Sequence, residues 1–126
     1  MGRTLFVAAG FAALALASPA AAQEDRRICV NNQKEKRVVT AIHAARPDSN
    51  RWGKNLIPGS RLGPGGMMIV DFADGTSNCV FDIRATLDEG TPSLGKKVDV
   101  CNRAWWVVYD GEMKPPNCPL DVERRR

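Results

Sequence analysis

The chain has little of the side-chain chemistry that most enzymes use. Its 126 residues include one histidine, His43, and no serine stands in a G-x-S-x-G turn. A Ser–His or Cys–His pair for nucleophilic catalysis would have to use His43, which falls in the middle of a predicted strand. We expect His43 to be packed or hydrogen-bonded in place, and a protein that is not an enzyme. A small hydrolase that uses His43 is the alternative.

Metal and cofactor motifs are also missing. The four cysteines lack the C-x₂-C spacing of a zinc site, and one histidine does not complete a zinc ligand set. Residues 71–78 look faintly like a calcium loop, but they lack its D-x-[DN]-x-[DN]-G order. We interpret Asp74-Gly75 as a hairpin turn, with Gly75 at positive φ. No cofactor and no metal are expected.

Long apolar runs are confined to the N-terminus. There, Arg3 precedes an apolar run at residues 5–17 and the small residues Ala20-Ala21-Ala22. This order is typical of a secretory signal peptide. We predict a Sec-type signal at residues 1–22, cleaved after Ala22, and one domain at residues 23–126 that is periplasmic or secreted. No later run approaches the roughly 20 residues of a membrane span.

The four cysteines all follow the predicted cleavage site. In an oxidising compartment an even set of cysteines is most simply a set of disulfides. Two pairings fit the sequence: Cys79–Cys101 with Cys29–Cys118, or Cys29–Cys79 with Cys101–Cys118. The bond Cys29–Cys118 would tie the two ends of the domain together.

The rest of the chain has the pattern of short strands between turns, without a convincing helix. We predict strands at 27–31, 37–45, 67–72, 78–87, 96–101 and 104–109, and a short extended piece at 56–57. Alternation in residues 78–87 places Phe81 and Ile83 on one face and Asp82 and Arg84 on the other. The prediction is an all-β, immunoglobulin-like β-sandwich, with a small barrel as the second choice.

One detail of the strand pattern conflicts with the first cysteine pairing. Cys79 shares its face with Phe81, whereas Cys101 shares its face with the polar Asp99. If the two strands were direct neighbours with the cysteines opposite each other, Phe81 would lie opposite Asp99. A β-bulge, or cysteines just outside the regular ladder, would remove the conflict.

Charge and aromatic residues suggest where a partner could bind. The formal net charge is +4, part of it in the basic tail 123–126. Such a surplus suits anionic lipid headgroups or cell-wall polymers, although an ordinary solvated surface explains it equally. Export argues against nucleic acid, and we expect a monomer. Trp52, in a polar loop, and Trp106 are candidates for a binding surface, although Trp52 also suits a plug over one end of the sandwich.

Several short motifs together resemble a family of small exported bacterial proteins without an established function. The motifs here are Val30-Asn31, Trp52-Gly53, Pro64-Gly65, C-V-F-D-I-R at 79–84 and V-D-V-C at 98–101. The resemblance implies the bond Cys79–Cys101. Such sequences are sometimes labelled argininosuccinate lyase, but a small β-rich domain cannot build that large helical tetramer.

These observations favour a non-enzymatic exported β-sandwich that binds a protein or an envelope polymer. Inhibition of a host hydrolase such as lysozyme is an alternative, because small disulfide-bonded β domains can plug an enzyme cleft. Asp82 and Asp99 are interpreted as solvent-facing charges, with Arg84 or Lys97 as the expected partners.

Overall fold

The computed structural model describes residues 24–124, and side chains as far as Asp121. The predicted signal peptide, residues 1–22, therefore lies outside the described residues. The described residues include most of the predicted domain at 23–126. The elements, in chain order, are β1 (Arg27–Asn32), β2 (Val39–Ala45), β3 (Met67–Asp71), β4 (Val80–Leu87), β5 (Ser93–Asp99), β6 (Trp105–Val108) and α1 (Pro119–Arg124).

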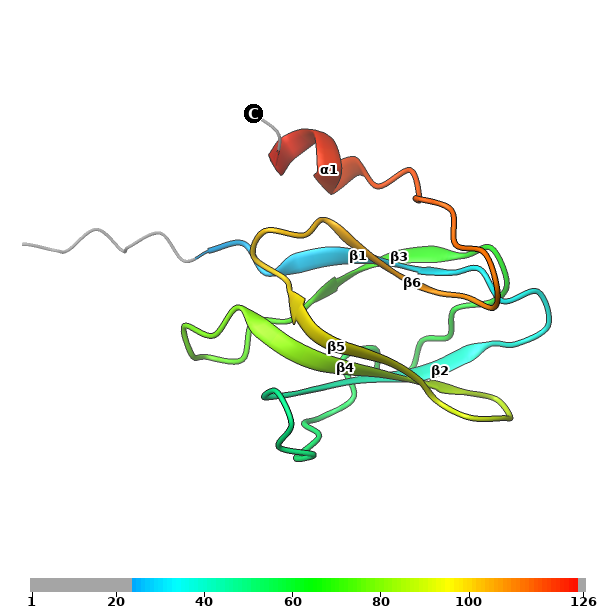
Figure 1. Ribbon diagram of the computed structural model, residues 1–126, viewed down its shortest axis with the longest axis horizontal. Coiled ribbons are helices and arrows are strands. Elements are labelled where there is room, and N and C mark those ends of the chain that lie inside the picture. Colours follow the sequence, from blue (N-terminus) through cyan, green and yellow to red (C-terminus); the bar gives the residue numbers. More distant parts are fainter. Residues whose placement is uncertain (1–23, 125–126) are drawn as a thin grey trace, which may run out of the picture.

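The strands form two sheets that lie face to face (Figure 1). One sheet has the order β3-β1-β6 and the other has the order β2-β4-β5. Every pairing is antiparallel except β1 with β6, which is parallel. The predicted immunoglobulin-like sandwich is confirmed, and because the sheets stay separate the small barrel is excluded.

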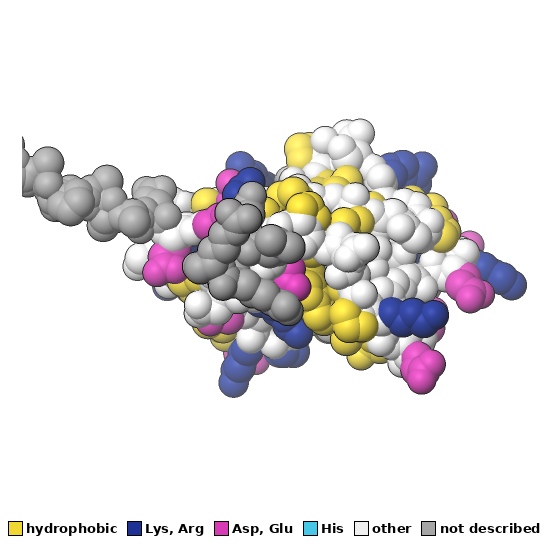
Figure 2. All heavy atoms as spheres, turned by 90° about the horizontal axis from the view of Figure 1, so that it is seen from above, with side chains coloured by type: hydrophobic (Ala, Val, Ile, Leu, Met, Phe, Trp, Pro, Cys, Tyr) yellow, Lys and Arg dark blue, Asp and Glu magenta, His cyan; other side chains and the backbone are white. Residues whose placement is uncertain are grey.

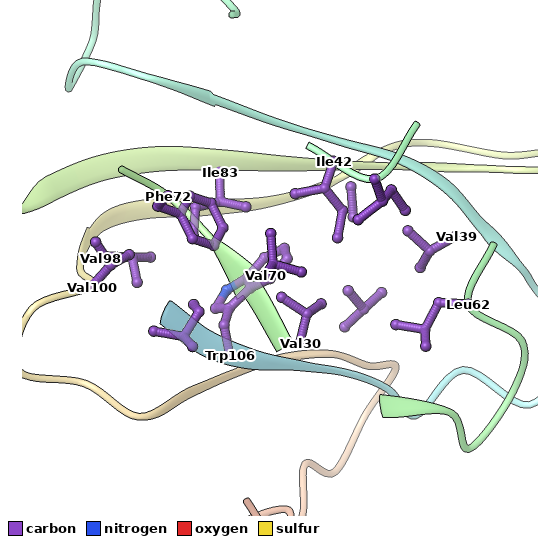
Figure 3. Close-up of a cluster of buried hydrophobic side chains, with 14 of the residues drawn as sticks. Val30, Val39, Ile42, Leu62, Val70, Phe72, Ile83, Val98, Val100 and Trp106 are labelled. Atoms are coloured by element: carbon purple, nitrogen blue, oxygen red, sulfur yellow. The ribbon is translucent and has the colours of Figure 1, made fainter. Parts of the chain in front are cut away.

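The core lies between the sheets and follows from alternation along the strands (Figure 3). The larger fully buried side chains include Phe72, Ile28, Ile42 and Ile83. Burial of each such side chain stabilises the fold by roughly 1.5–3 kcal/mol. Two disulfides, Cys29–Cys118 and Cys79–Cys101, lie at the edge of this core. The second is the bond that the resemblance implies.

The register of β4 and β5 resolves the conflict over their faces, because Asp99 lies opposite Val80 and not opposite Phe81. Phe81 pairs with Val98, while Ile83 pairs with Gly95. Two residues of β5 therefore lie opposite the single residue Asp82 of β4. Phe81 and Val98 both point inward and are 3% and 1% exposed, and the extra residue keeps Gly95 on the same inward face as Val98.

The cysteines of the second disulfide lie just outside this ladder. Cys79 precedes β4 and Cys101 follows the end of β5, with their Cα atoms 5.3 Å apart. The N–H of Val100 donates to the Cys79 carbonyl at 2.8 Å, which continues the pairing one step beyond the strands. Cys79 therefore lies opposite Val100, one position from Cys101, and this offset removes the opposition of Phe81 and Asp99.

Two predictions about connections are wrong. Gly75 does have positive φ, at 85°, but β3 and β4 belong to different sheets, so Asp74-Gly75 turns the chain between sheets and is not a hairpin. Residues 56–57 do not form a strand, although the N–H of Leu56 bonds the carbonyl of Ile42 on β2 at 2.8 Å. In both cases the local conformation, a turn and an extended segment, is predicted correctly. The segment that each one packs against in the fold differs from the prediction.

The expectation of no helix is also wrong, because α1 forms near the C-terminus. Its six residues are too few for an amphipathic repeat, but Pro119 suits the first helical position and Asp121 suits the positive end of the helix dipole. The bond Cys29–Cys118 and the buried Leu120 hold the segment against β1 and β6 (Figure 1). Arg125 and Arg126 of the basic tail lie outside the described residues.

None of the helices in residues 24–124 is both long and apolar enough to cross a bilayer.

Candidate functional site: the loop after β2

The loop that follows β2 is fixed to the outer face of the β2-β4-β5 sheet. We call residues 46–54 the β2 loop. Its main attachment is the Asp82 carboxylate on β4, which is 2% exposed. One carboxylate oxygen accepts from the N–H of Asp48 at 2.8 Å and from Lys96 Nζ at 2.9 Å. The other oxygen accepts from the N–H of Lys97 at 3.0 Å, inside the bulge.

Asp82 thus holds the β2 loop and the bulge of β5 at one point. The N–H of Asp48, the Lys96 ammonium and the N–H of Lys97 all favour the ionised carboxylate, and they lower the pKa of Asp82 to about 2. Lys96 also contacts Asp48 at 3.1 Å, and the bond from Lys96 to Asp82 raises the pKa of the Lys96 ammonium. The prediction that Asp82 is a solvent-facing charge is wrong, because the β2 loop covers it.

A second attachment fixes the far end of the loop. The Arg84 guanidinium lies 4.6 Å from the centre of the Trp52 ring, a cation–π contact. His43, which pairs with Arg84 across β2 and β4, contacts the Gly53 carbonyl through Nδ1 at 2.7 Å. Since a carbonyl only accepts, the Nδ1–H of His43 is the donor. The N–H of Gly53 in turn donates to the Ala44 carbonyl at 2.9 Å.

Turns inside the loop complete its rigid shape. The N–H of Ser49 bonds the Arg46 carbonyl at 3.0 Å, and the N–H of Arg51 bonds the Ser49 hydroxyl at 3.2 Å. Asp48 and Asn50 have φ of 61° and 55°, which these two residue types tolerate better than most. The loop therefore displays its exposed side chains from a fixed backbone.

Three exposed cations, Arg46, Arg51 and Lys54, project from this fixed backbone. Among the side chains that the structure describes, those of residues 24–121, none forms an ion pair or a hydrogen bond with these three cations. By contrast, Lys34 pairs with Asp110 at the other end of the sandwich, at 2.8 Å. Asp48, the acidic residue of the β2 loop, pairs with Lys96, so the exposed surface of the loop is mainly cationic.

A pocket of about 380 Å³ lies beside these cations. Its apolar lining includes Ala44, Leu56, Phe72 and Phe81, and its charged lining consists of the three loop cations and Asp74. Hydrogen bonds from Thr76 hold the pKa of the Asp74 carboxyl below its usual value. The pocket thus combines an apolar wall with a mainly cationic rim.

The two predicted tryptophans have different environments. Trp52 lies on the outer face of the sheet against Arg84, so it does not plug an end of the core. The assignment of Trp106 to a binding surface is wrong, because it pairs with the inward-facing Val30 and is only 7% exposed. Its neighbour Trp105 points outward and packs against the cluster around Cys118 and Leu120. Trp105 and Trp106 thus face opposite ways, as neighbouring residues of a strand do.

The opposite sheet has an apolar outer surface. Figure 2 shows hydrophobic side chains gathered near the middle of the face that carries α1, with charged side chains toward its margins. On β3 the outward-facing Met67 and Ile69 are 38% and 47% exposed. In the part of the chain that the structure describes, Met67 and Ile69 line none of the four main pockets, so this surface is weaker as a candidate site than the β2 loop.

The described residues bring together one group of possible metal ligands, Glu24 with Cys79 and Cys101. Both sulfur atoms belong to a disulfide and cannot act as thiolates. The partner of His43 is a backbone carbonyl, which orients the ring structurally. Neither arrangement indicates a reaction.

Sequence reasoning missed the β2 loop as a site, although it singled out Trp52. The available signal was the polar run Pro47-Asp48-Ser49-Asn50 next to cations, together with an aspartate on the outward face of a strand. Comparison of the chain with protein-family models, curated proteins and solved structures gives no match. The functional argument therefore rests on the geometry of this chain.

Proposed function

We propose that this protein is an exported, non-enzymatic binding domain, periplasmic or secreted, that holds an anionic cell-envelope polymer on its β2 loop. The observation that supports the proposal is the trio of unpaired cations on a rigid backbone. Two disulfides suit a domain that works in an oxidising compartment.

Rigidity matters because binding orders flexible groups at a cost in free energy. The β2 loop is already held by Asp82, by Arg84 and by its internal turns. A polymer that binds there orders only the long side chains of the cations, so more of the interaction energy remains for affinity.

Charge selects the class of polymer. Arg46, Arg51 and Lys54 attract carboxylate, phosphate or sulfate groups, and the nearest acidic lining residue is the single Asp74. Arginine forms bidentate bonds with such planar or tetrahedral anions. An acidic polymer with repeated anionic groups can contact several of these cations at once.

Equilibrium binding to purified envelope polysaccharides, acidic and neutral fractions matched in size, tests the proposal. We expect the acidic fraction to bind and the neutral one not to bind. The R46Q/R51Q/K54Q variant should bind about tenfold more weakly or worse, since each exposed ion pair contributes up to about 1 kcal/mol. The control K36Q/R61Q/K114Q removes the same charge from exposed positions outside the loop and should bind nearly as the wild type does.

An equal loss in both triple variants would contradict the proposal, because it would show attraction to net charge alone. Binding to no acidic fraction would also contradict it. A lysozyme inhibition assay on the same proteins provides the remaining comparison: strong inhibition without polymer binding would assign the loop to hydrolase inhibition instead.

A further inference from the structure

The pocket beside the β2 loop opens into the interior of the sandwich. Phe72 directly follows β3 in one sheet, and Phe81 lies on β4 in the other. Their ring centres are 6.4 Å apart, and both rings belong to the main core. The inner wall of the pocket is therefore an extension of the core that reaches the surface between the two sheets.

The outer wall of the pocket is also preformed. Leu56 packs against the core from the segment that follows the loop, and its N–H bonds the Ile42 carbonyl at 2.8 Å. The Asn55 side chain accepts from the N–H groups of Ile42 and Ile57, each at 3.0 Å. A ligand would meet a preformed pocket with a partly apolar wall and would not have to open one.

The rim adds a charge preference to this pocket. Arg46, Arg51 and Lys54 line it on one side, and Asp74 lines it at the start of the connection to β4. Thr76 donates to the Asp74 carboxylate through its N–H and its hydroxyl, at 3.0 and 2.5 Å. The Asp74 carboxylate is thus held in place on the rim, where three cationic side chains face this single anion.

We propose that this pocket binds an amphiphilic anion: a carboxylate or phosphate monoester carried on an acyl or alkyl chain of medium length. The chain lies against Leu56, Phe72 and Phe81, and the anionic head contacts the three cations. The volume of about 380 Å³ falls within the ~300–1,000 Å³ typical of small-molecule sites. The inference rests on the proposed function, because the same cations hold the head, and it specifies an acylated anionic component of the envelope.

The larger basin at the opposite end of the molecule does not compete for this ligand. It measures about 1090 Å³ and is lined mainly by polar and charged residues. Among them Lys34 is already paired with Asp110. Its lining includes Pro64 but none of the aliphatic or aromatic side chains, such as Leu56, Phe72 and Phe81, that line the pocket beside the β2 loop.

Calorimetric titration of the exported, oxidised protein with decanoate and with decyl phosphate, below their micelle concentrations, tests the inference. Acetate and inorganic phosphate supply the anion without the chain, and decyl glucoside supplies the chain without the anion. We expect each decyl anion to bind at least about tenfold more tightly than its three comparators, because the chain and the charge both contribute. The two decyl anions distinguish a carboxylate source from a phosphate source.

Substitutions outside the β2 loop test where the alkyl chain and the anionic head group of the ligand lie. Ala73 lines the pocket and is exposed, so Ala73→Glu should weaken decanoate binding about fivefold relative to the isosteric Ala73→Gln. Asp74→Asn keeps an acceptor for Thr76 but removes the rim carboxylate, and should tighten decanoate binding about threefold. A purely structural role of these residues would not produce a tighter complex.

The inference would be overturned if neither decyl anion bound better than its comparator without a chain, or if the decyl anion that binds did so equally well in all the Ala73 and Asp74 variants. If acidic polysaccharide still binds through the loop cations in that case, the proposed function survives without the amphiphile. If decanoate binds as expected and no acidic polysaccharide does, the pocket is assigned and polymer binding fails.

Discussion

Asp82 is the residue on which the candidate site depends most. It is an aspartate on the outward face of a strand, yet its carboxylate is buried and accepts three hydrogen bonds from two separate segments. A buried carboxylate is tolerated only when such donors replace water. We therefore attribute its burial to the β2 loop and the β5 bulge, which it joins.

Asp82→Ala should lower the free energy of unfolding by about 3 kcal/mol, because it leaves two N–H groups and an ammonium without their acceptor. Urea denaturation measures the change. Asp110→Ala is the control: that carboxylate is 74% exposed and pairs only with Lys34, so the loss should stay below about 1 kcal/mol. Similar losses in the two variants would contradict the role given to Asp82.

The stability of the fold should fall in acid. The folded protein lowers the pKa of Asp82 from 3.8 to about 2, so the ionised carboxylate stabilises the fold above about pH 4 and this contribution disappears as the pH falls toward 2. Hydrogen bonds from Asn102 and Thr76 also lower the pKa values of Asp99 and Asp74. Urea midpoints measured from pH 5 to pH 2 should decline less steeply in Asp82→Asn, and an unchanged slope would be evidence against this assignment.

Position 95 requires a glycine because the Trp106 indole packs directly against the backbone there and leaves no room for a side chain. A Cβ atom at this position would lie 2.5 Å from Trp106 Nε1. Gly95→Ala should therefore displace the ring and lower the free energy of unfolding by about 1–3 kcal/mol. Gly63→Ala, where a Cβ meets no atom within 4 Å, is the matched control. Tryptophan fluorescence and urea denaturation report both effects, and a Gly95→Ala protein as stable as the control would refute the contact.

At the scale of elements, the C-terminal segment with α1 depends on one covalent bond. Helix α1 has six residues and would be unstable in isolation. The Cys29–Cys118 bond spans 89 residues and Cys79–Cys101 spans 22. Leu120, 2% exposed, and the disulfide itself form a small cluster with Ala104 and Trp105.

The variant C29S/C118S should lose about 4–5 kcal/mol and C79S/C101S about 3–4 kcal/mol, because the longer closed loop restricts the unfolded chain more. In C29S/C118S, chymotrypsin should also cleave after Leu120, which is buried in the intact fold, while residues 24–108 stay folded. Mass spectrometry of the digest and urea denaturation measure these outcomes. Equal stabilities with a protected C-terminus would show that the segment docks without the disulfide.

For the whole molecule, the sequence predicts correctly those features that follow from the alternation of polar and apolar residues along a strand. The two-faced pattern of β4 places Phe81 and Ile83 in the core, and the same parity separates Trp105 from Trp106. It cannot say which tryptophan points inward, because that depends on the register with β1. The Trp106 assignment fails for this reason, as does the Asp74-Gly75 hairpin, whose strands belong to different sheets.

The candidate site is less predictable because residues far apart in the sequence build it. Asp48 and Asp82 are 34 positions apart, and only the folded sheet brings the loop over β4. The motifs Trp52-Gly53 and C-V-F-D-I-R can be recognised in the sequence, but their common task cannot. In the structure, Trp52, Gly53, Asp82 and Arg84 all take part in holding the same loop.

The amide chemical-shift map of the ¹⁵N-labelled protein, recorded during titration with oligosaccharide fragments of an acidic envelope polymer, tests the central claim most directly. The account predicts that the largest changes occur at residues 46–54, on the rigid β2 loop, and that they are absent in R46Q/R51Q/K54Q. Changes centred on residues 33–37 and 110–114 at the opposite end, or on Met67 and Ile69, would contradict it.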